Sequence, residues 1–388
     1  MLPIVLVIGG LAALGICACG GVSLMGFFFA GMAHHDMVHE DMKMAVMAQD
    51  DMKMDMELKA EEEMFAKKDW KPEHGEFKRL QIPGLRGDIR ALSFTADGAS
   101  MLAATSAESV HSWDLATWNV RTPRLGNVNP GFGGQEVGAA AFTPNGDKVF
   151  VGRHGGSLCS YDLTREPASQ KRIQIGDPGR QLAFNHIAVS RDGTRICTSH
   201  GDSVAYVWEV ATLNKVTTLK DFKNQVGAGA FHPNSEVVAA AAEDVQVYDP
   251  KAKDVTHFKA DGPLWFKGLE FSPDGRFLSG VKGNSLHHWR TDAAKGGMFK
   301  AMDPYDQRAT HLAYSPDGLT LAVAVHHTRA YLYDVATVRQ RFMLDLRKGR
   351  DNWDTPAAIA FHPDSRRFAV ARGATIYLFN LDGLRKGK

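Results

Sequence analysis

The sequence predicts an all-β fold: a seven-bladed β-propeller of four-stranded antiparallel blades, preceded by a transmembrane helix and a helical stalk. Three observations predict it. A turn motif recurs seven times, each repeat contains a strand that ends in an aromatic residue, and the N-terminus is a long uncharged apolar run. We therefore divide the chain into an anchor (1–33), a stalk or linker rich in Met and acids (34–75) and a propeller (76–388).

The repeated turn starts with an aromatic or apolar residue and usually ends in Asp-Gly or Asn-Gly. Successive copies are separated by 40 residues (Phe231 to Phe271) to 48 residues (Phe94 to Phe142). Proline and Asp-Gly at these positions favour a tight reversal between two strands. A period of this length is typical of propeller blades. The copies are Phe94–Gly98, Phe142–Gly146, Val189–Gly193, Phe231–Ser235, Phe271–Gly275, Tyr314–Gly318 and Phe361–Ser365.

A second signal follows each turn. A short β-rich run, a small turn and another β-rich run lead to an aromatic residue, and a further strand then leads to the next repeat. Each repeat thus contains four strands whose apolar faces need neighbours on both sides. The strand endings are Trp113-Asp114, Tyr161-Asp162, Trp208-Glu209, Tyr248-Asp249, Trp289-Arg290, Tyr333-Asp334 and Phe379-Asn380.

The ends of the repeat region predict how the ring closes. The run Phe77–Ile82 precedes the first repeat and has no partner there, while the last repeat ends after its third strand near Leu381. We expect the leading run to form the outer strand of the last blade. Closure of this kind leaves no large open sheet edge.

These turns and aromatic endings resemble the WD40-repeat family over about four-fifths of the chain, residues 76–388 of 388. With the apolar N-terminus, the resemblance is to a membrane-anchored, bacterial-type member. The chain departs from the family in detail, since only Trp113-Asp114 is a literal Trp-Asp and no Gly-His dipeptide occurs. The family's Asp-His-Ser-Trp hydrogen-bond tetrad is therefore expected to be mostly absent, with Asp202 and Trp208 as its best remnant.

The composition excludes several classes of function. The chain has 45 Lys and Arg against 44 Asp and Glu, so it lacks the basic balance of a nucleic-acid-binding protein. Its four cysteines include no C-x-x-C motif for zinc or redox chemistry. Cys159 and Cys197 are expected to be small buried hydrophobes, and no cofactor is predicted.

The N-terminal run predicts a single-pass membrane protein. Residues 2–33 contain no charged side chain, and roughly 20 apolar residues suffice to span a bilayer as a helix. A cleaved signal peptide ending at Gly31-Met32-Ala33 and a lipoprotein site at Ile16–Cys19 are the alternatives. The run is longer than the apolar core of a signal peptide, and no Lys or Arg precedes it. The side of the membrane that the propeller occupies is not indicated.

The stalk carries an unusual concentration of methionine. Six residues have M-x-M and M-x-x-M spacings: Met42, Met44, Met47, Met52, Met54 and Met56. Thioether sulfur is a soft ligand that suits Cu(I), and this pattern resembles the methionine motifs of copper-handling proteins. An amphipathic helix that uses Met as a flexible apolar surface is the competing interpretation, and the interleaved acids fit a solvated helix.

The resemblance implies that one face of the propeller binds partners. This face carries the turns between second and third strands and the loops between blades. Exposed aromatics beside Arg are typical interface anchors. The turn histidines His154, His200, His326 and His327 come from different blades, so we expect them to be solvated and not to bind metal. The predicted partner-binding residues are Phe132, Trp265, Tyr305, Arg308, Arg350 and Trp353.

No catalytic motif is present: the chain has no Gly-x-Ser-x-Gly, no His-Glu-x-x-His and no P-loop. The sequence therefore predicts a membrane-tethered scaffold that binds protein partners and is not an enzyme. A copper-binding membrane protein that uses the stalk is one alternative. A propeller hydrolase is the other, since fold alone does not assign function.

Overall fold

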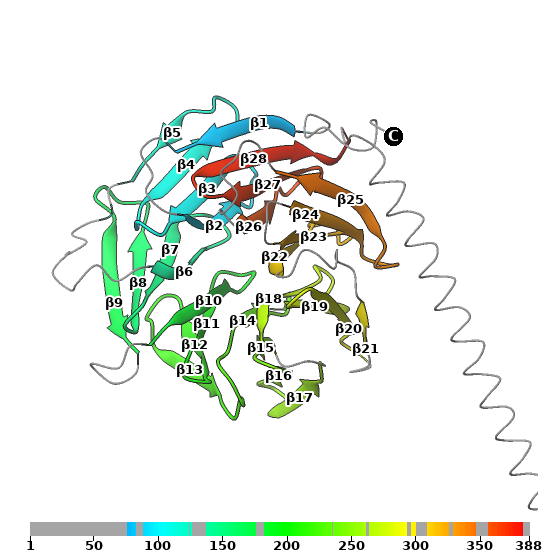
Figure 1. Ribbon diagram of the computed structural model, residues 1–388. Helices are drawn as coiled ribbons and strands as arrows, with labels where there is room; N and C mark the ends of the chain where they lie inside the picture. The colour runs from blue at the N-terminus through cyan, green and yellow to red at the C-terminus, as the bar shows by residue number, and fades with distance from the viewer. Residues whose placement is uncertain are drawn as a thin grey trace, which may run out of the picture. The chain divides into compact units, whose positions relative to one another are not determined.

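The structure, a computed structural model, describes residues 76–82, 88–123, 125, 137–175, 182–234, 236–260, 264–292, 296–299, 309–325, 329–346 and 356–382. These residues contain 28 β-strands in seven four-stranded sheets, in which every pairing is antiparallel. The sheets stand around a common axis as the blades of a propeller (Figure 1). The seven blades predicted from the turn motif are confirmed.

The first three blades follow chain order from the axis outward. Blade 1 comprises β2 (Ile89–Phe94), β3 (Ser100–Thr105), β4 (Val110–Asp114) and β5 (Val120–Arg121). Blade 2 comprises β6 (Val137–Phe142), β7 (Lys148–Arg153), β8 (Ser157–Asp162) and β9 (Ser169–Gln174). Blade 3 comprises β10 (Phe184–Val189), β11 (Arg195–His200), β12 (Ala205–Glu209) and β13 (Lys215–Leu219).

The next three blades repeat this order. Blade 4 comprises β14 (Ala228–Phe231), β15 (Val238–Ala241), β16 (Val245–Asp249) and β17 (Asp254–Phe258). Blade 5 comprises β18 (Phe266–Phe271), β19 (Phe277–Lys282), β20 (Ser285–Arg290) and β21 (Gly296–Phe299). Blade 6 comprises β22 (Ala309–Tyr314), β23 (Thr320–Val325), β24 (Arg329–Asp334) and β25 (Gln340–Asp345).

Blade 7 joins the two ends of the repeat region. It contains β26 (Pro356–Phe361), β27 (Arg367–Arg372), β28 (Thr375–Asn380) and, outermost, β1 (Glu76–Gln81). Strand β1 pairs antiparallel with β28, with Leu80 opposite Ile376. The predicted closing strand is therefore confirmed. Ile376 packs with Met101 of blade 1 in one buried cluster, and each such side chain contributes about 1.5–3 kcal/mol on burial.

The turn motif folds through its own hydrogen bonds. In blade 5 the Ser272 hydroxyl donates to the Asp274 carboxylate over 2.6 Å, and that carboxylate accepts the Arg276 N–H over 3.0 Å. Gly275 adopts a φ of 73°, a left-handed conformation that glycine reaches without steric cost. Thr95, Ser190 and Ser315 repeat the hydroxyl–Asp bond in their own blades. The motif thus builds the same reversal in each of these blades.

In the aromatic–acid endings of the third strands, the aromatic residue packs in the core and the acid binds the turn that follows. Tyr161, Tyr333 and Phe379 are at most 1% exposed. The acid that follows organises the next turn: the Asp114 carboxylate accepts the Thr117 N–H over 2.7 Å and the Thr117 hydroxyl over 2.8 Å. This local bonding explains why Ala-Thr follows the acid in several repeats.

Blade 3 contains Trp208 and Asp202, the predicted remnant of the tetrad. The indole N–H of Trp208 donates to Thr198 over 2.9 Å, and the Thr198 hydroxyl contacts His200 Nε2 at 2.8 Å. The Asp202 carboxylate accepts the Tyr206 hydroxyl over 3.5 Å. Trp208, Thr198 and His200 therefore form one connected set of hydrogen bonds in blade 3.

Cys159 and Cys197 are free and buried, as predicted. The anchor (1–33) and the stalk (34–75), including the six candidate methionines, lie outside the described residues. Within the described ranges, no helix combines the length and the hydropathy needed to cross a bilayer. The propeller lies within Lys71–Lys388, the second of two units into which the chain divides.

Candidate functional site: the central channel

The innermost strand of most blades begins with the same irregularity in strand pairing. In six blades the pairing of this strand shifts register between its first and third residues, for example between Ile89 and Ala91 of β2. The second residue is left outside the ladder, as in a β-bulge. The residues at this bulge position are Arg90, Gly138, Asn185, Lys267, Thr310 and Ala357.

The glycine at this position in blade 2 allows blades to pack closely. A Cβ on Gly138 would overlap the backbone carbonyl of Phe184 in blade 3. Gly227, which precedes β14, has the same relation to the carbonyl of Phe266 in blade 5. Polar side chains occupy the bulges of blades 1, 3, 5 and 6 instead. The polar side chains at the bulge positions therefore come from those four blades.

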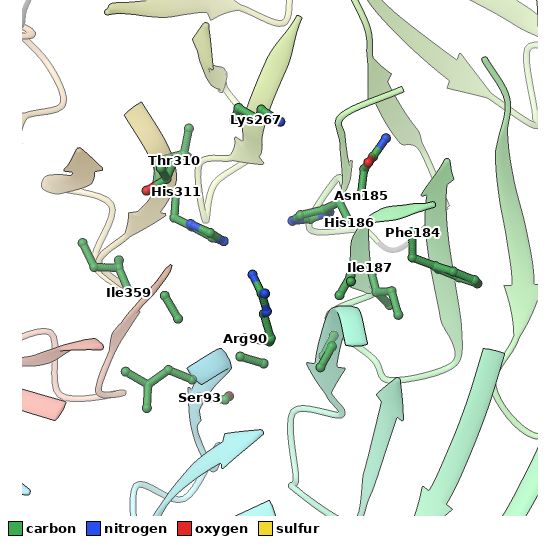
Figure 2. A pocket seen from close by; sticks show the side chains of 18 of the residues that line it. Arg90, Ser93, Phe184, Asn185, His186, Ile187, Lys267, Thr310, His311 and Ile359 are labelled. Atoms are coloured by element: carbon green, nitrogen blue, oxygen red, sulfur yellow. The ribbon is translucent and has the colours of Figure 1, made fainter. Parts of the chain in front are cut away.

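A cavity of about 900 Å³ occupies the channel between the inner strands. Residues from both ends of β2, β6 and β10 line it, so the cavity extends along the strands. Figure 2 shows Arg90, His186 and His311 directed into this space from three sides. Lys267 and Asn185 also belong to its wall.

Two imidazoles in the channel are strongly perturbed. Burial lowers the pKa of His186 to about 4. Burial, followed by the positive charges of His186, Arg90 and Lys267, lowers the pKa of His311 to about 3. Both rings are therefore neutral at pH 7. Because His186, Arg90 and Lys267 all lower the pKa of His311, the four side chains share one electrostatic environment.

Hydrogen bonds orient the wall of the channel in blade 3. The Gly229 N–H donates to Nδ1 of His186 over 3.3 Å, which places the proton of the neutral ring on Nε2. The side-chain amide of Asn185 donates to the Val226 carbonyl over 2.8 Å. Nδ1 of His311 is buried and meets no hydrogen-bond partner in the described part of the chain.

We call the end of the channel where the innermost strands begin its mouth. Of the predicted partner-binding residues, the structure describes one, and it lies at this mouth. Trp265 is half-buried and lines the cavity beside Leu264, which is 48% exposed. The ammonium of Lys267 lies 5.2 Å from the centre of the Trp265 ring. The other predicted residues, Phe132, Tyr305, Arg308, Arg350 and Trp353, lie outside the described residues.

The turn histidines have different roles. His154 lines the cavity near its mouth. His200 is fully buried, and its ring lies 4.4 Å from that of Phe184, so the expectation that it is solvated was wrong. His326 and His327 lie outside the described residues. Among the residues that the structure describes, no three metal-ligating side chains are grouped as a metal site.

The channel residues Arg90, His186, Lys267 and His311 were missed by the sequence analysis, although a signal for them exists. Arg90 and Lys267 each precede the aromatic residue of their turn motif, Phe94 or Phe271, by four positions. His186 and His311 precede Val189 and Tyr314 by three. Alignment of the repeats would have placed these residues at two adjacent positions of the inner strand.

Comparison with known proteins gives partial matches. No protein-family model matches the chain. The chain is 28% identical over 207 residues to transcription factor unc-37 of Caenorhabditis elegans, covering 52% of this chain and 32% of that protein. It is 25% identical over 205 residues to autophagy-related protein 16 of Arabidopsis thaliana, covering 42% and 39%. It is 26% identical over 214 residues to pre-mRNA-processing factor 17 of Saccharomyces cerevisiae, covering 52% and 44%.

Each of these matches spans less than half of the relative's own length. Together with the seven-bladed fold, the relatives support the resemblance to the WD40-repeat family. The three relatives come from a nematode, a plant and a yeast, and the bacterial type stays a prediction.

Proposed function

We propose that this protein is a scaffold that binds a protein partner at the mouth of its central channel and does not act as an enzyme. The exposed Leu264 beside the half-buried Trp265, at the rim of a deep cavity, carries the proposal. Aromatic and aliphatic side chains around a concave surface are typical anchors of protein interfaces. The resemblance to the WD40-repeat family implies that partners bind this same face of the propeller.

A comparison of two exposed leucines tests the binding face. Leu264 lies at the mouth, whereas Leu319, which is 60% exposed, lies in the turn between β22 and β23 at the opposite end of the inner strands. We expect a photo-crosslinking residue at position 264 of the full-length protein to form adducts with a discrete protein in native membranes. The same residue at position 319 should form none. Equal adducts at both positions would contradict the proposal.

A second substitution tests whether the Trp265 ring contributes to capture of the partner. Trp265→Ala should abolish the adduct formed from position 264, while circular dichroism and the melting temperature stay close to those of the unsubstituted protein. An adduct of unchanged intensity would show that the Trp265 ring contributes nothing to capture.

We further propose that residues 2–33 tether the propeller to a membrane. The support is the run itself, which contains no charged side chain and exceeds the roughly 20 residues that span a bilayer. The full-length protein should remain in the membrane pellet after carbonate extraction. Leu14→Arg, which places a charge near the middle of the run, should shift part of it to the supernatant. Complete release of the unsubstituted protein would contradict the tether.

A further inference from the structure

One position of the inner strands distinguishes two blades from the other five. It lies three residues before the first residue of the turn motif, and blades 3 and 6 have histidine there, His186 and His311. The other five blades have alanine or glycine at this position: Ala91, Ala139, Ala228, Gly268 and Ala358. Figure 2 shows both histidine rings directed into the cavity. The channel therefore has two imidazoles at equivalent positions of two blades that are three apart in the ring.

The two imidazoles are neutral and offer hydrogen bonds to an occupant of the channel. Burial is the largest cause of the lowered pKa of each ring. The Gly229 N–H donates to Nδ1 of His186, so Nε2 of this ring carries the proton and can donate. Nδ1 of His311 is buried and has no hydrogen-bond partner in the described part of the chain. Because a neutral imidazole has one donor and one acceptor, the pair suits a group that can both accept and donate.

The surroundings of the histidines disfavour a charged occupant. Transfer of a charge from water into a buried site is costly unless a partner of opposite charge meets it. The positive charges that lower the pKa of His311 would also act against a cation. Arg90 and Lys267 line the cavity, but both are engaged in other interactions, so neither is a free partner for an anion. An uncharged hydroxyl group, which accepts and donates, meets these conditions.

From the histidines toward the turn motifs, the described wall of the cavity is apolar apart from Ser93, whose hydroxyl donates to the Phe94 carbonyl. Figure 2 shows aliphatic side chains on opposite sides of this space. The cavity reaches from Trp265 at the mouth to Ala96 and Pro144 in the turns, and a six-residue strand such as β2 spans roughly 20 Å. One position after the histidines, four aliphatic residues line it: Leu92, Ile187, Leu312 and Ile359.

We infer that the central channel binds an uncharged amphiphile, a molecule with one alkyl chain and a hydroxyl head group. The hydroxyl accepts the Nε2–H of His186 and bonds to the ring of His311, and the chain lies along the aliphatic residues. The volume of about 900 Å³ lies within the range of small-molecule sites. This site goes beyond the proposed capture of a protein partner, because its ligand lies inside the channel and needs no second protein.

Photolabelling of the full-length protein in native membranes tests the inference. The probe is dodecanol with a diazirine at the end of its chain, and labelled peptides are mapped by mass spectrometry. We expect labels on the inner strands β2, β10 and β22, at no more than one probe molecule per propeller. Unlabelled dodecanol should compete for these positions about 10-fold more strongly than dodecanoate or dodecylammonium, which have the same chain and a charged head group.

Histidine variants test the hydrogen bonds to the head group. His311→Phe keeps an aromatic ring and should raise the dodecanol concentration that halves channel labelling by about 3- to 10-fold, the effect of one neutral hydrogen bond. His186→Phe should have an effect of at least this size. The control is His257→Phe on β17, which is exposed and does not line the cavity, and it should leave this concentration unchanged. Melting temperatures should show that all three variants are folded.

Three results would each overturn the inference. The first is that no residue lining the cavity is labelled. The second is that dodecanoate or dodecylammonium competes as strongly as dodecanol. The third is that His257→Phe weakens competition as much as His311→Phe.

The amphiphile site and the partner site can fail separately. Trp265→Ala should abolish the protein adducts formed from position 264 and retain channel labelling by the dodecanol probe. Absence of channel labelling in a protein that still forms these adducts would overturn the amphiphile site and leave the proposed function supported.

Discussion

The two ends of the inner strands are held together in different ways, and the difference shows where function can reside. At one end, the turns between first and second strands repeat one set of hydrogen bonds, such as Ser190 to Asp192 and Ser272 to Asp274, each 2.6 Å long. At the channel mouth, contacts differ from blade to blade. Glycine fills the bulge position in blade 2 and Arg90 fills it in blade 1. The repeated turns at one end specify the architecture, so the residues at the channel mouth can differ from blade to blade.

The contacts at the mouth differ from blade to blade, and one of them joins blades 1 and 2. Glu108 forms a buried ion pair with Arg153 and accepts the Tyr161 hydroxyl over 2.6 Å. The two charged side chains are 10% and 11% exposed. Glu108→Ala should lower the free energy of unfolding by about 3–5 kcal/mol, because it leaves a buried guanidinium without its partner. Denaturant unfolding measures this change.

An exposed ion pair provides the control for Glu108. Glu236 pairs with Lys251 over 2.6 Å, but the lysine is 75% exposed. Glu236→Ala should therefore change the free energy of unfolding by less than about 1 kcal/mol. Similar losses from both substitutions would mean that the buried pair has no special role in joining the blades.

The repeated face can be perturbed at matched glycines. Gly275 and Gly193 have φ angles of 73° and 70°. A Cβ on Gly275 would overlap the ring of His232, whereas on Gly193 it would meet only the Pro144 ring at 3.4 Å. We expect Gly193→Ala to cost about 1–2 kcal/mol for its backbone conformation alone.

Gly275→Ala should cost roughly 1–3 kcal/mol more than Gly193→Ala, because the His232 ring must also move. Chemical denaturation of both variants gives the difference. Equal costs would show that the contact of His232 with the turn of the next blade contributes nothing.

Glu270 lies on β18 three residues after the bulge residue Lys267, toward the end of the strand that carries the repeated turn. Burial raises the pKa of Glu270 to about 8, although its carboxylate accepts the Tyr314 N–H over 3.1 Å. The folded state therefore binds more protons than the unfolded state between pH 4.5 and about 8, and stability falls as pH rises through this window.

Glu270→Gln removes that penalty and keeps an oxygen to accept the Tyr314 N–H. The variant should be more stable than the unsubstituted protein by roughly 1–2 kcal/mol at pH 8 and no more stable near pH 4.5. Thermal unfolding across this pH range measures the effect. A constant difference at every pH would indicate a packing change and not a titration.

The smallest expected effect concerns the channel histidines. His186 and His311 have pKa values lowered to about 4 and about 3 from 6.5, so the unfolded state binds more protons below pH 6.5. Stability should fall as pH decreases from 6.5 toward 4. Replacing both with Gln should flatten this slope, with the charged neighbours Arg90, Lys267 and Asp88 unchanged. Gln in place of His257, which is exposed and outside the channel, is the control for the loss of an imidazole.

Much of the fold was predictable because its determinants are local. A serine or threonine hydroxyl, an aspartate and a glycine within five residues build the repeated turn in blades 1, 3, 5 and 6, as at Ser272–Arg276. Seven such turns specify seven blades, and the unpaired leading run predicts the closing strand β1. The roles of single polar residues were less predictable. Trp208 donates to Thr198 of the neighbouring strand and His200 is buried, because the packing of neighbouring strands decides these contacts.

The sequence by itself determined the repeat, the blade count and the way the ring closes, since these follow from hydrogen bonds and apolar patterns within each repeat. Only the tertiary structure decided which residues meet in the channel. Arg90, His186, Lys267 and His311 belong to four blades, and their offsets from the turn motif do not by themselves show that their side chains meet. Ring closure brings their strands around one axis, and the bulges place their side chains in one cavity.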